Sequence, residues 1–570
     1  MRFGSVDTFM EFGGWEYRMG RPIANEGFLK ALLTYGTYDS YEFFCPDVHH
    51  MERFRERLES LVPSPELRSR VEVSLHVSLA ESLEIRGYDV FHLGDFTYFM
   101  PHLVLLRNRK SRKAFPVTGV THSLDGVFMN LRYMELLLAG LTPYDGVVCT
   151  SRCALEAVRK SLYEAGARLK ETTGADFSPS VRLAKIPLGV DETFFDSVDR
   201  REARAYFRIP MDWKVCLTVG RISPRQKTDL TPVIEMFSRI FSESGTDRWI
   251  WLIAGGGDDG AVKDLEALLA QAGLGNRVVL FPNFPEEAKT RLYGASDFYL
   301  SPVDNFQETF GLSVVEAMAC GLPVICSDFS GYRDLVVNGR TGYLVETVWP
   351  ERLPGFVLEN LGVLDDSLAS FYMAQCVALD LGRLEDAILK LFRDDDERRR
   401  MGREAQRRAR AYRWREVIGS YESFWDELRQ EARKAEPRGS KAMRNPLVSD
   451  PSLIFSHYPT RRLKASDRVT RTPLGKEALK GAFQPLRYED ARACLFEELE
   501  GYLLRSLEAG GRTVEGLRDG ASEALGATKR QVDFHLLWMM KHGLVECAQA
   551  GREKGEDAFG SGEGEAGPCA

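Results

Sequence analysis

The stretch NFQETFGLSVVEAMACGLPVICSDFSGYRDLVVNGRTGYLV, from Asn305 to Val345, decides the fold of this chain. Its apolar spacing predicts a helix that opens near Gly311. The sequence Gly321-Leu322-Pro323 ends that helix, because Gly stops a helix and Pro cannot continue it. The apolar run Val324-Ile325-Cys326 then predicts a buried strand. Helix followed by buried strand is typical of a sheet whose faces are covered by helices.

Two glutamates bracket the start of this helix. Glu308 and Glu316 are eight residues apart, so they are nearly aligned along one face if both lie on the helix. If the helix begins near Gly311, Glu308 lies in the loop before it and Glu316 in its second turn. The N–H groups of Phe310, Gly311 and Leu312 would then be unpaired at the positive end of the helix dipole. A phosphate is stabilised at such a position, and flanking carboxylates suit sugar hydroxyls.

The complete pattern is E-T-F-G-L-x-x-x-E-A-M-A-C-G-L-P-V followed by G-x-T-G-Y-L-V. It resembles the E-x7-E signature of retaining GT-B glycosyltransferases in the glycosyl transferases group 1 family, of the glycogen-synthase and sucrose-synthase type. A bare pair of glutamates at this spacing is usually a solvated helix face, so the surrounding residues carry the resemblance. The resemblance implies an α/β fold of the GT-B type, with two Rossmann-like domains facing across a cleft.

The rest of the chain fits two such halves. Alternating strands and helices from residue 1 to 188 predict an N-terminal Rossmann-like acceptor domain with a parallel sheet. A second set of strands, from 189 to 436, predicts the donor domain for the nucleotide sugar, together with its closing helices. The linking sequence Ile186–Asp191 resembles the I-P-x-G-V-D that joins the halves in this family. Residues 350–378 interrupt the expected course of the second half and are predicted to be an insertion.

The N-terminal half offers three candidate residues. Gly13 and Gly14 follow the first expected strand, where glycines allow close backbone approach to a ligand, and the family resemblance places this loop beside the donor phosphates. An ordinary glycine loop is the alternative. His122 ends the apolar strand around Val120, and ligands of open α/β sheets bind beyond the carboxyl ends of strands. The family's histidine at this place hydrogen-bonds the transferred sugar, although an isolated histidine is more often structural.

The second half opens with two candidate cations, Arg221 and Lys227, in the loop after an expected strand. A guanidinium and an ammonium together can neutralise a diphosphate leaving group. The loop resembles the family's G-R-x-x-x-x-K, but the spacing is longer by one residue, which leaves Arg225 as an alternative to Lys227. Further along, Asn283 and Phe284 occupy the loop that in the family lies against the nucleotide base, mainly through backbone groups.

The resemblance implies transfer of a sugar, with retention, from a UDP-, GDP- or ADP-linked donor to an unidentified acceptor such as a protein, peptide or glycan. Arg221 and Lys227 would hold the diphosphate, Glu316 the ribose, and Glu308 with the N–H groups near Phe310 the sugar. His122 would support the charge that develops during transfer. The sequence predicts no cofactor and no metal, because no D-x-D motif occupies a donor-site position. The alternatives are a sugar-nucleotide epimerase of the same fold and a non-catalytic protein that binds nucleotide sugars.

Composition excludes several other classes of protein. The chain has 570 residues, 44% of them hydrophobic, and is long enough for about three domains. No apolar run approaches the ~18 residues that span a membrane, and the N-terminus lacks a signal-peptide pattern. The ten cysteines form no C-x-x-C pairs, and several lie in apolar runs, which favours reduced thiols in the cytoplasm over a zinc site. The net charge of −8 argues against general nucleic-acid binding.

The C-terminal quarter lies beyond the resemblance. Residues 437–487 are predicted to be a linker whose second half carries eight basic residues against two acidic ones, a pattern that could attract an anionic partner. Residues 488–548 predict three helices and a short strand, an order that resembles a winged helix, with Thr513 and Thr528 as N-caps. Docking of a protein or peptide is the favoured role, and DNA reading by Thr528–Arg530 is the alternative. Residues 549–570 are rich in Gly and Glu and predict a disordered tail.

Overall fold

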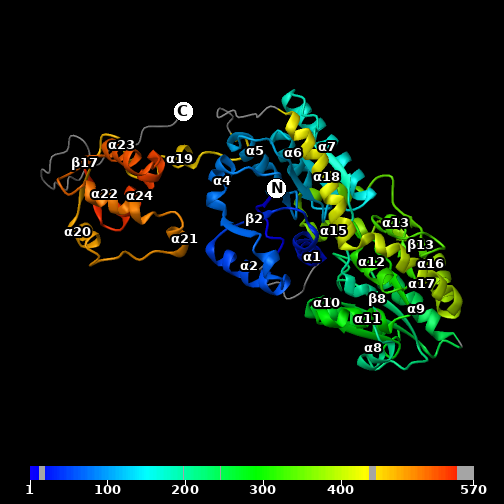
Figure 1. Cartoon of the computed structure of the whole chain (residues 1–570). Coiled ribbons are helices and arrows are strands. Elements are labelled where there is room, and N and C mark those ends of the chain that lie inside the picture. The colour runs from blue at the N-terminus through cyan, green and yellow to red at the C-terminus, as the bar shows by residue number, and fades with distance from the viewer. Residues whose placement is uncertain (12–19, 197, 244, 436–444, 549–570) are drawn as a thin grey trace, which may run out of the picture. The chain divides into compact units, whose positions relative to one another are not determined.

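The computed structural model describes residues 1–11, 20–196, 198–243, 245–435 and 445–548 (Figure 1). The chain divides into two compact units, Met1–Val448 and Ser449–Ala570. The larger unit contains two lobes, each built around one parallel sheet, as the sequence predicts. Across the described residues, no helix is both long and apolar enough to span a bilayer.

The first lobe contains a seven-stranded sheet in the order β3-β2-β1-β4-β5-β6-β7, and every neighbouring pair is parallel. Its central strands are buried on both faces, which explains their largely apolar sequences. The strands are β1 (Arg2–Ser5), β2 (Ser40–Cys45), β3 (Val71–Leu75), β4 (Val90–Leu93), β5 (Val117–Val120), β6 (Gly146–Cys149) and β7 (Arg182–Lys185). The main helices are α1 (Gly20–Tyr35), α2 (Val48–Leu61), α4 (Leu79–Ile85), α5 (Met100–Lys110), α6 (Met129–Leu138) and α7 (Arg152–Thr173).

The second lobe contains a six-stranded parallel sheet in the order β10-β9-β8-β11-β12-β13. All six strands were expected from the sequence, and the prediction of two Rossmann-like domains is confirmed. The strands are β8 (Lys214–Val219), β9 (Trp249–Gly255), β10 (Val278–Pro282), β11 (Phe298–Ser301), β12 (Val324–Ser327) and β13 (Gly342–Val345). The helices are α8 (Arg200–Tyr206), α9 (Thr231–Ser242), α10 (Asp259–Gln271), α11 (Lys289–Ala295), α12 (Leu312–Ala319), α13 (Tyr332–Leu335), α16 (Leu381–Arg393) and α17 (Asp395–Ala409).

The last helix of the larger unit returns to the first lobe. This helix, α18 (Trp414–Lys434), lies against α1 and is drawn in yellow in Figure 1. Its residues Trp414, Tyr421 and Trp425 are buried in the same apolar core as Phe3 and Phe28. The sequence division, which placed 189–436 in one domain, therefore differs from the structure at this helix. The reason is that a strongly amphipathic helix buries its apolar face wherever a complementary core is exposed.

The insertion expected at residues 350–378 is a closed excursion from the second lobe. A two-stranded antiparallel ribbon of β14 (Thr347–Val348) and β15 (Ala378–Leu379) joins its ends. Between these strands lie the helices α14 (Gly355–Leu358) and α15 (Asp366–Ala374). Asp365 caps α15 by accepting hydrogen bonds from the N–H groups of Ser367 and Leu368.

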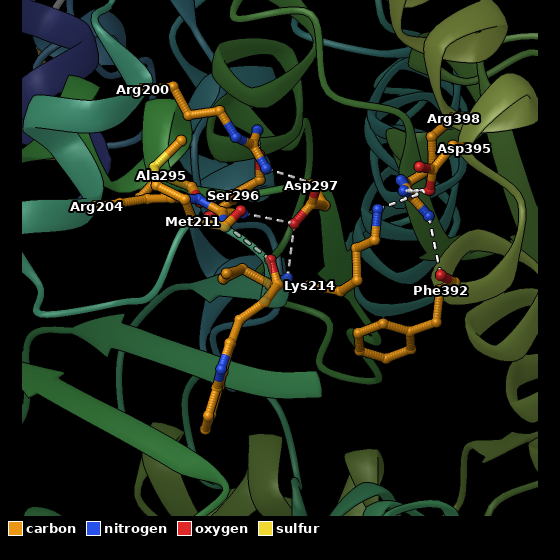
Figure 2. Close-up of polar contacts among 12 residues, drawn as sticks. Arg200, Arg204, Met211, Lys214, Ala295, Ser296, Asp297, Phe392, Asp395 and Arg398 are labelled. Carbon is orange, nitrogen blue, oxygen red and sulfur yellow. Dashed lines mark hydrogen bonds and ion pairs between the residues drawn. The ribbon is translucent and has the colours of Figure 1, made fainter. Parts of the chain in front are cut away.

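A buried ionic network anchors the amino-terminal ends of β8 and β11. Figure 2 shows the guanidinium of Arg204 directed at the carboxylate of Asp297, with an Nη2–Oδ2 distance of 2.9 Å. Arg204 also donates hydrogen bonds to backbone oxygens, including that of Ala295. Asp297 accepts a further bond from the N–H of Val215 in β8. This network fixes the strand ends opposite to those from which the candidate site is built.

The smaller unit is a three-stranded antiparallel sheet with several helices. The N-cap predictions are confirmed: the hydroxyl of Thr513 accepts from Gly516, and Thr528 forms a capping box with Gln531. Gly543 follows the last helix with φ of +70°, as its predicted stop role requires. The elements are α19 (Pro451–Ile454), β16 (Arg468–Arg471), α20 (Pro473–Leu479), α21 (Glu489–Arg492), α22 (Glu497–Ser506), β17 (Arg512–Thr513), α23 (Val514–Leu525), α24 (Lys529–Lys541) and β18 (Val545–Ala548).

The basic stretch predicted as a linker is part of this sheet, which corrects the sequence prediction. Strand β16 lies between β17 and β18, and its Val469 is fully buried. Val469 is the one apolar residue of this four-residue strand. The alternation of apolar and polar residues that predicts a strand is therefore almost absent from its sequence. Residues 436–444, at the start of that linker, and the tail predicted at 549–570 lie outside the described residues.

Candidate functional site

The candidate site is built where β8 and β11 end. The backbone crosses very close to the neighbouring strand at this edge, because a β-carbon on Gly255 would lie 1.5 Å from the carbonyl oxygen of Gly220. Only glycine fits at position 255. The next residue after Gly220 is Arg221, so this close packing fixes the start of the loop that carries both candidate cations. Asn305, fully buried after β11, donates to the carbonyl oxygen of Arg225 and fixes the end of the same loop.

Two neutral amides hold the guanidinium of Arg221. Its Nη1 donates to Oε1 of Gln226 at 2.8 Å, and its Nη2 donates to Oε1 of Gln307 at 2.7 Å. Burial lowers the pKa of Arg221, although the charges of Glu308 and Asp125 act in the opposite direction. An arginine stays charged in such surroundings. The two amides orient this charge.

The second candidate cation, Lys227, pairs with Glu308. Its Nζ donates to Oε2 of that carboxylate, and both side chains are largely buried. Arg225, the alternative for this position, is exposed to solvent. The structure therefore places Lys227, with Arg221, on the side of the loop that meets the E-x7-E segment. The extra residue in this loop is accommodated without moving the lysine away from the site.

Glu308 takes the position at the helix start that the sequence analysis left for a phosphate. Burial would raise the pKa of Glu308, but Lys227 and the N–H groups of Phe310 and Gly311 outweigh it and lower the pKa. The N–H of Phe310 donates to Oε1 of Glu308 at 3.1 Å, so the prediction that this group is unpaired is wrong. The carboxylate of Glu308 thus supplies an anion that the positive end of α12 stabilises. Helix α12 does begin at Leu312, with Gly311 as its N-cap at φ of +104°.

Glu316 lies in the second turn of α12, as predicted, but it is buried. It is 2% exposed, its Oε1 accepts from Nζ of Lys289 at 2.6 Å, and its Oε2 accepts from the hydroxyl of Tyr293 at 2.8 Å. Each carboxylate oxygen has a second lone pair, so these partners do not exhaust its capacity to accept hydrogen bonds. Glu308 therefore lies just before α12 and pairs with Lys227, whereas Glu316 lies in the second turn of α12 and pairs with Lys289.

Asn283 and Phe284 follow β10 at the same edge of the sheet. The side chain of Asn283 forms two hydrogen bonds of 3.0 Å with the backbone of Gly257, in the turn after β9. Its φ is +50°, a conformation that asparagine tolerates better than most residues. Phe284 is partly buried, with its ring stacked on that of Phe281. The side chain of Asn283 thus joins the turn after β10 to the turn after β9.

His122 lies in the first lobe, directly after β5. Its Nε2 is 2.7 Å from the carbonyl oxygen of Gly94 and 3.0 Å from Oδ1 of Asn25. A carbonyl oxygen only accepts, so Nε2 carries the hydrogen and Nδ1 has the free lone pair. Burial lowers the pKa of His122 to about 4, and the ring is therefore neutral near pH 7. It can polarise a ligand by hydrogen bonding but carries no positive charge.

The remaining sequence candidates, Gly13 and Gly14, lie outside the described residues. Sequence reasoning missed the residues that orient the candidates: Gln226 and Gln307 for Arg221, Lys289 and Tyr293 for Glu316, and Asn25 for His122. Lys289 and Tyr293 are four residues apart on α11 and therefore share one face of the helix. This spacing could have identified them from the sequence. Gln226 and Gln307 lie in loops, where spacing carries no such information.

Comparison with known proteins identifies the second lobe. Residues 199–354 match the family described as "Glycosyl transferases group 1". The matched segment includes Arg221, Lys227, Glu308 and Glu316. The match to this family thus covers the part of the second lobe that carries these four residues.

The chain is also similar to curated proteins with a named activity. The chain is 28% identical over 218 residues to the D-inositol 3-phosphate glycosyltransferase of Acidothermus cellulolyticus, covering 37% of this chain and 48% of that protein. It is 33% identical over 168 residues to the D-inositol 3-phosphate glycosyltransferase of Mycolicibacterium smegmatis, covering 29% of this chain and 36% of that protein. The matches thus span less than half the length of these two relatives.

Solved structures show the fold of the two lobes together. HepE of Anabaena, solved in complex with UDP and glucose, aligns with 75% of this chain and 100% of its own at a TM-score of 0.50 and 14% identity. Sucrose-phosphate synthase from Thermosynechococcus elongatus aligns with 75% of this chain and 99% of its own at a TM-score of 0.49 and 19% identity. Together with the two parallel sheets, the likeness to HepE shows that the fold is GT-B, as predicted.

Proposed function

We propose that this protein is a retaining glycosyltransferase that moves a sugar from a nucleotide diphosphate sugar to an acceptor. One observation carries the proposal: Lys227 and Glu308 pair directly, beside Arg221, where β8 and β11 end. Open α/β sheets bind their ligands beyond the carboxyl ends of their strands. The group 1 domain contains all three residues.

The two cations suit a diphosphate leaving group. Arg221 presents a guanidinium fork that neutral amides orient, and Lys227 adds a point charge from the same loop. Positive charge that is fixed in advance stabilises the negative charge that develops as the diphosphate leaves. We assign this leaving-group role to Arg221 and Lys227.

The E-x7-E carboxylates suit the two sugars of the donor. Glu308 lies at the start of α12 among N–H groups, so we assign it to the hydroxyls of the transferred sugar. Glu316 lies deeper, against Lys289, and we assign it to the ribose. His122 approaches from the first lobe, and its Nδ1 is assigned to a hydroxyl of the transferred sugar.

The donor and acceptor are proposed by class. UDP-sugars come first among donors because HepE was solved with UDP and glucose; GDP- and ADP-sugars are the other members of the class. The acceptor proposed is a hydroxyl-bearing glycan, protein or peptide. The relatives' acceptor, inositol 3-phosphate according to their name, is a starting point for such a search.

A donor screen tests the proposal. UDP-, GDP- and ADP-sugars are compared for thermal stabilisation of the protein and for slow hydrolysis of the sugar–phosphate bond. At least one should stabilise wild type, and Arg221→Ala should abolish that stabilisation and the hydrolysis. Nucleotide release that rises with added acceptor separates a transferase from an epimerase. Failure of all three donor classes would overturn the proposal.

A further inference from the structure

The inserted segment forms hydrogen bonds with two loops of the larger unit, the loop after β5 and the loop after β8. Asp366, in helix α15 of the insertion, accepts a hydrogen bond of 2.8 Å from the N–H of Val127, in the loop that follows His122. One turn further along α15, the fully buried Ser370 donates to Oδ2 of Asp125 in the same loop. After α15, Gln375 donates to Oδ2 of Asp229 at 3.1 Å. The insertion is therefore a strap between the first lobe and the donor-side loop that begins at Arg221.

The strap keeps a carboxylate close to the proposed phosphate site. The hydroxyl of Ser370 holds Asp125, and the negative charge of Asp125 acts on the guanidinium of Arg221. In the ligand-free protein, Asp125 thus supplies negative charge where a diphosphate would bring its own. Two negative groups that act on one guanidinium repel each other in a partly buried site.

We propose that the diphosphate of a sugar nucleotide displaces Asp125 from the neighbourhood of Arg221 and so releases the strap from the loop after β5. The proposal rests on the donor site proposed above. Asp125 is then a residue that opposes nucleotide binding until the strap opens. The strap contacts break only when a ligand with the charge of a diphosphate arrives, so the donor side controls access to the first lobe.

Removing the charge of Asp125 tests the electrostatic part of the proposal. Asp125→Asn keeps the shape and the hydrogen bond from Ser370, and should tighten binding of UDP, GDP or ADP by about tenfold, measured by calorimetry. Asp365→Asn is the matched control, because it removes one carboxylate from the N-cap of α15 in the strap and keeps an N-cap residue. Unchanged or weaker nucleotide binding by Asp125→Asn alone would overturn the strap proposal. Absence of binding by wild type would overturn the donor site as well.

A reversible crosslink tests the movement of the strap. A β-carbon at Gly126 would lie 3.9 Å from Cγ of Asp366, so side chains at these two positions would be in van der Waals contact, and cysteines placed there can be tested for a disulfide. In the double variant Gly126→Cys/Asp366→Cys, oxidation should weaken binding of the same nucleotide at least tenfold, and dithiothreitol should restore it. The two single-cysteine variants should not respond to oxidant. Equal nucleotide affinity in the oxidised and reduced double variant would show that the strap does not move, against the proposal.

Discussion

Lys227 donates a hydrogen bond to Oε2 of Glu308, although 81 residues separate them in the chain. The contact joins the loop after β8 to the loop after β11, and both side chains are largely buried. The charged groups proposed for the diphosphate and for the sugar are therefore held together before any ligand binds. Preorganisation of this kind is what electrostatic catalysis requires, because charges already in place need not be reoriented during the reaction.

Loss of Lys227 should affect turnover more than donor affinity. Its charge matters most as the diphosphate leaves, so Lys227→Ala should lower kcat for donor hydrolysis by roughly 10²–10³. The exposed Arg225 provides the matched control, and Arg225→Ala should be near normal. Steady-state kinetics on both variants check this. A crippled Arg225→Ala beside a nearly normal Lys227→Ala would contradict the assignment.

The two glutamates should be separable by ligand. Glu316→Gln should weaken binding of the bare nucleotide diphosphate, whereas Glu308→Gln should matter only when the sugar is attached. Glu316→Gln also leaves Lys289 buried without its counter-charge, so it should lower the melting temperature. The double variant Lys289→Gln/Glu316→Gln should regain stability without regaining nucleotide affinity. Calorimetry measures the affinity of each variant for the bare nucleotide diphosphate and for the sugar nucleotide. An equal loss of affinity for the bare nucleotide in Glu316→Gln and Glu308→Gln would contradict the assignment.

The ion pair between Arg204 and Asp297 should contribute strongly to the stability of the second lobe. Arg204→Met takes the buried partner from the largely buried Asp297 and leaves it with the more exposed Arg200, so it should lower the free energy of unfolding by about 3–5 kcal/mol. Arg200, which is 42% exposed, pairs with the same carboxylate, and Arg200→Met should cost less than about 1 kcal/mol. Urea unfolding of the two variants measures the difference. Similar losses would mean that burial does not set the strength of this network.

Two buried histidines should make the protein less stable in acid. Burial lowers the pKa of His92 to about 3 and that of His122 to about 4, below the ~6.5 of an unfolded histidine. Between these values the unfolded chain binds protons that the folded protein does not. The free energy of unfolding should therefore fall as the pH drops from about 6.5 towards 4.

A single substitution isolates the contribution of His92. His92 lies among aromatic rings, including those of Phe28 and Trp425, so His92→Phe should fold and should flatten this pH dependence. Urea unfolding of wild type and variant at pH 7 and pH 5 measures the effect. An unchanged slope would contradict the assignment of acid sensitivity to this histidine.

The smaller unit should be dispensable for donor chemistry. Every residue assigned to chemistry precedes Val345, and Leu447 still packs on the core of the first lobe. Deletion of 449–570 should therefore leave donor hydrolysis intact. Transfer to a macromolecular acceptor should fall, because a docking module raises local acceptor concentration. Loss of hydrolysis in a folded truncated protein would place this unit in the active site, and no change in either activity would remove the docking role.

Most of the fold could be predicted because buried parallel strands leave uninterrupted apolar runs. Strands such as Val90–Leu93 and Val324–Ser327 are completely buried, and their predicted bounds agree with the structure to within a residue or two. An edge strand that is exposed and largely polar, such as β7, loses this signal. The sequence of β7, Arg-Leu-Ala-Lys, illustrates why that edge was missed.

The candidate site could be predicted as far as its charged residues. Arg221, Lys227, Glu308 and Glu316 follow expected strands or open an expected helix, so chain order alone brings them to one edge. The partners that orient them come from distant loops, as with Gln307 and Arg221, and only the folded backbone brings these together. The position of Glu308 at the helix start also follows from folding, since the positive end of α12 stabilises a nearby carboxylate.

The most direct test of the account is binding of a sugar nucleotide to wild type and to Arg221→Ala, measured by calorimetry across UDP-, GDP- and ADP-linked glucose. Wild type should bind one of these donors. Arg221→Ala, shown to be folded by its circular dichroism, should lose most of that affinity. Binding that is equal in both proteins, or absent from wild type for all three donors, would contradict the central claim that this site holds a nucleotide diphosphate sugar.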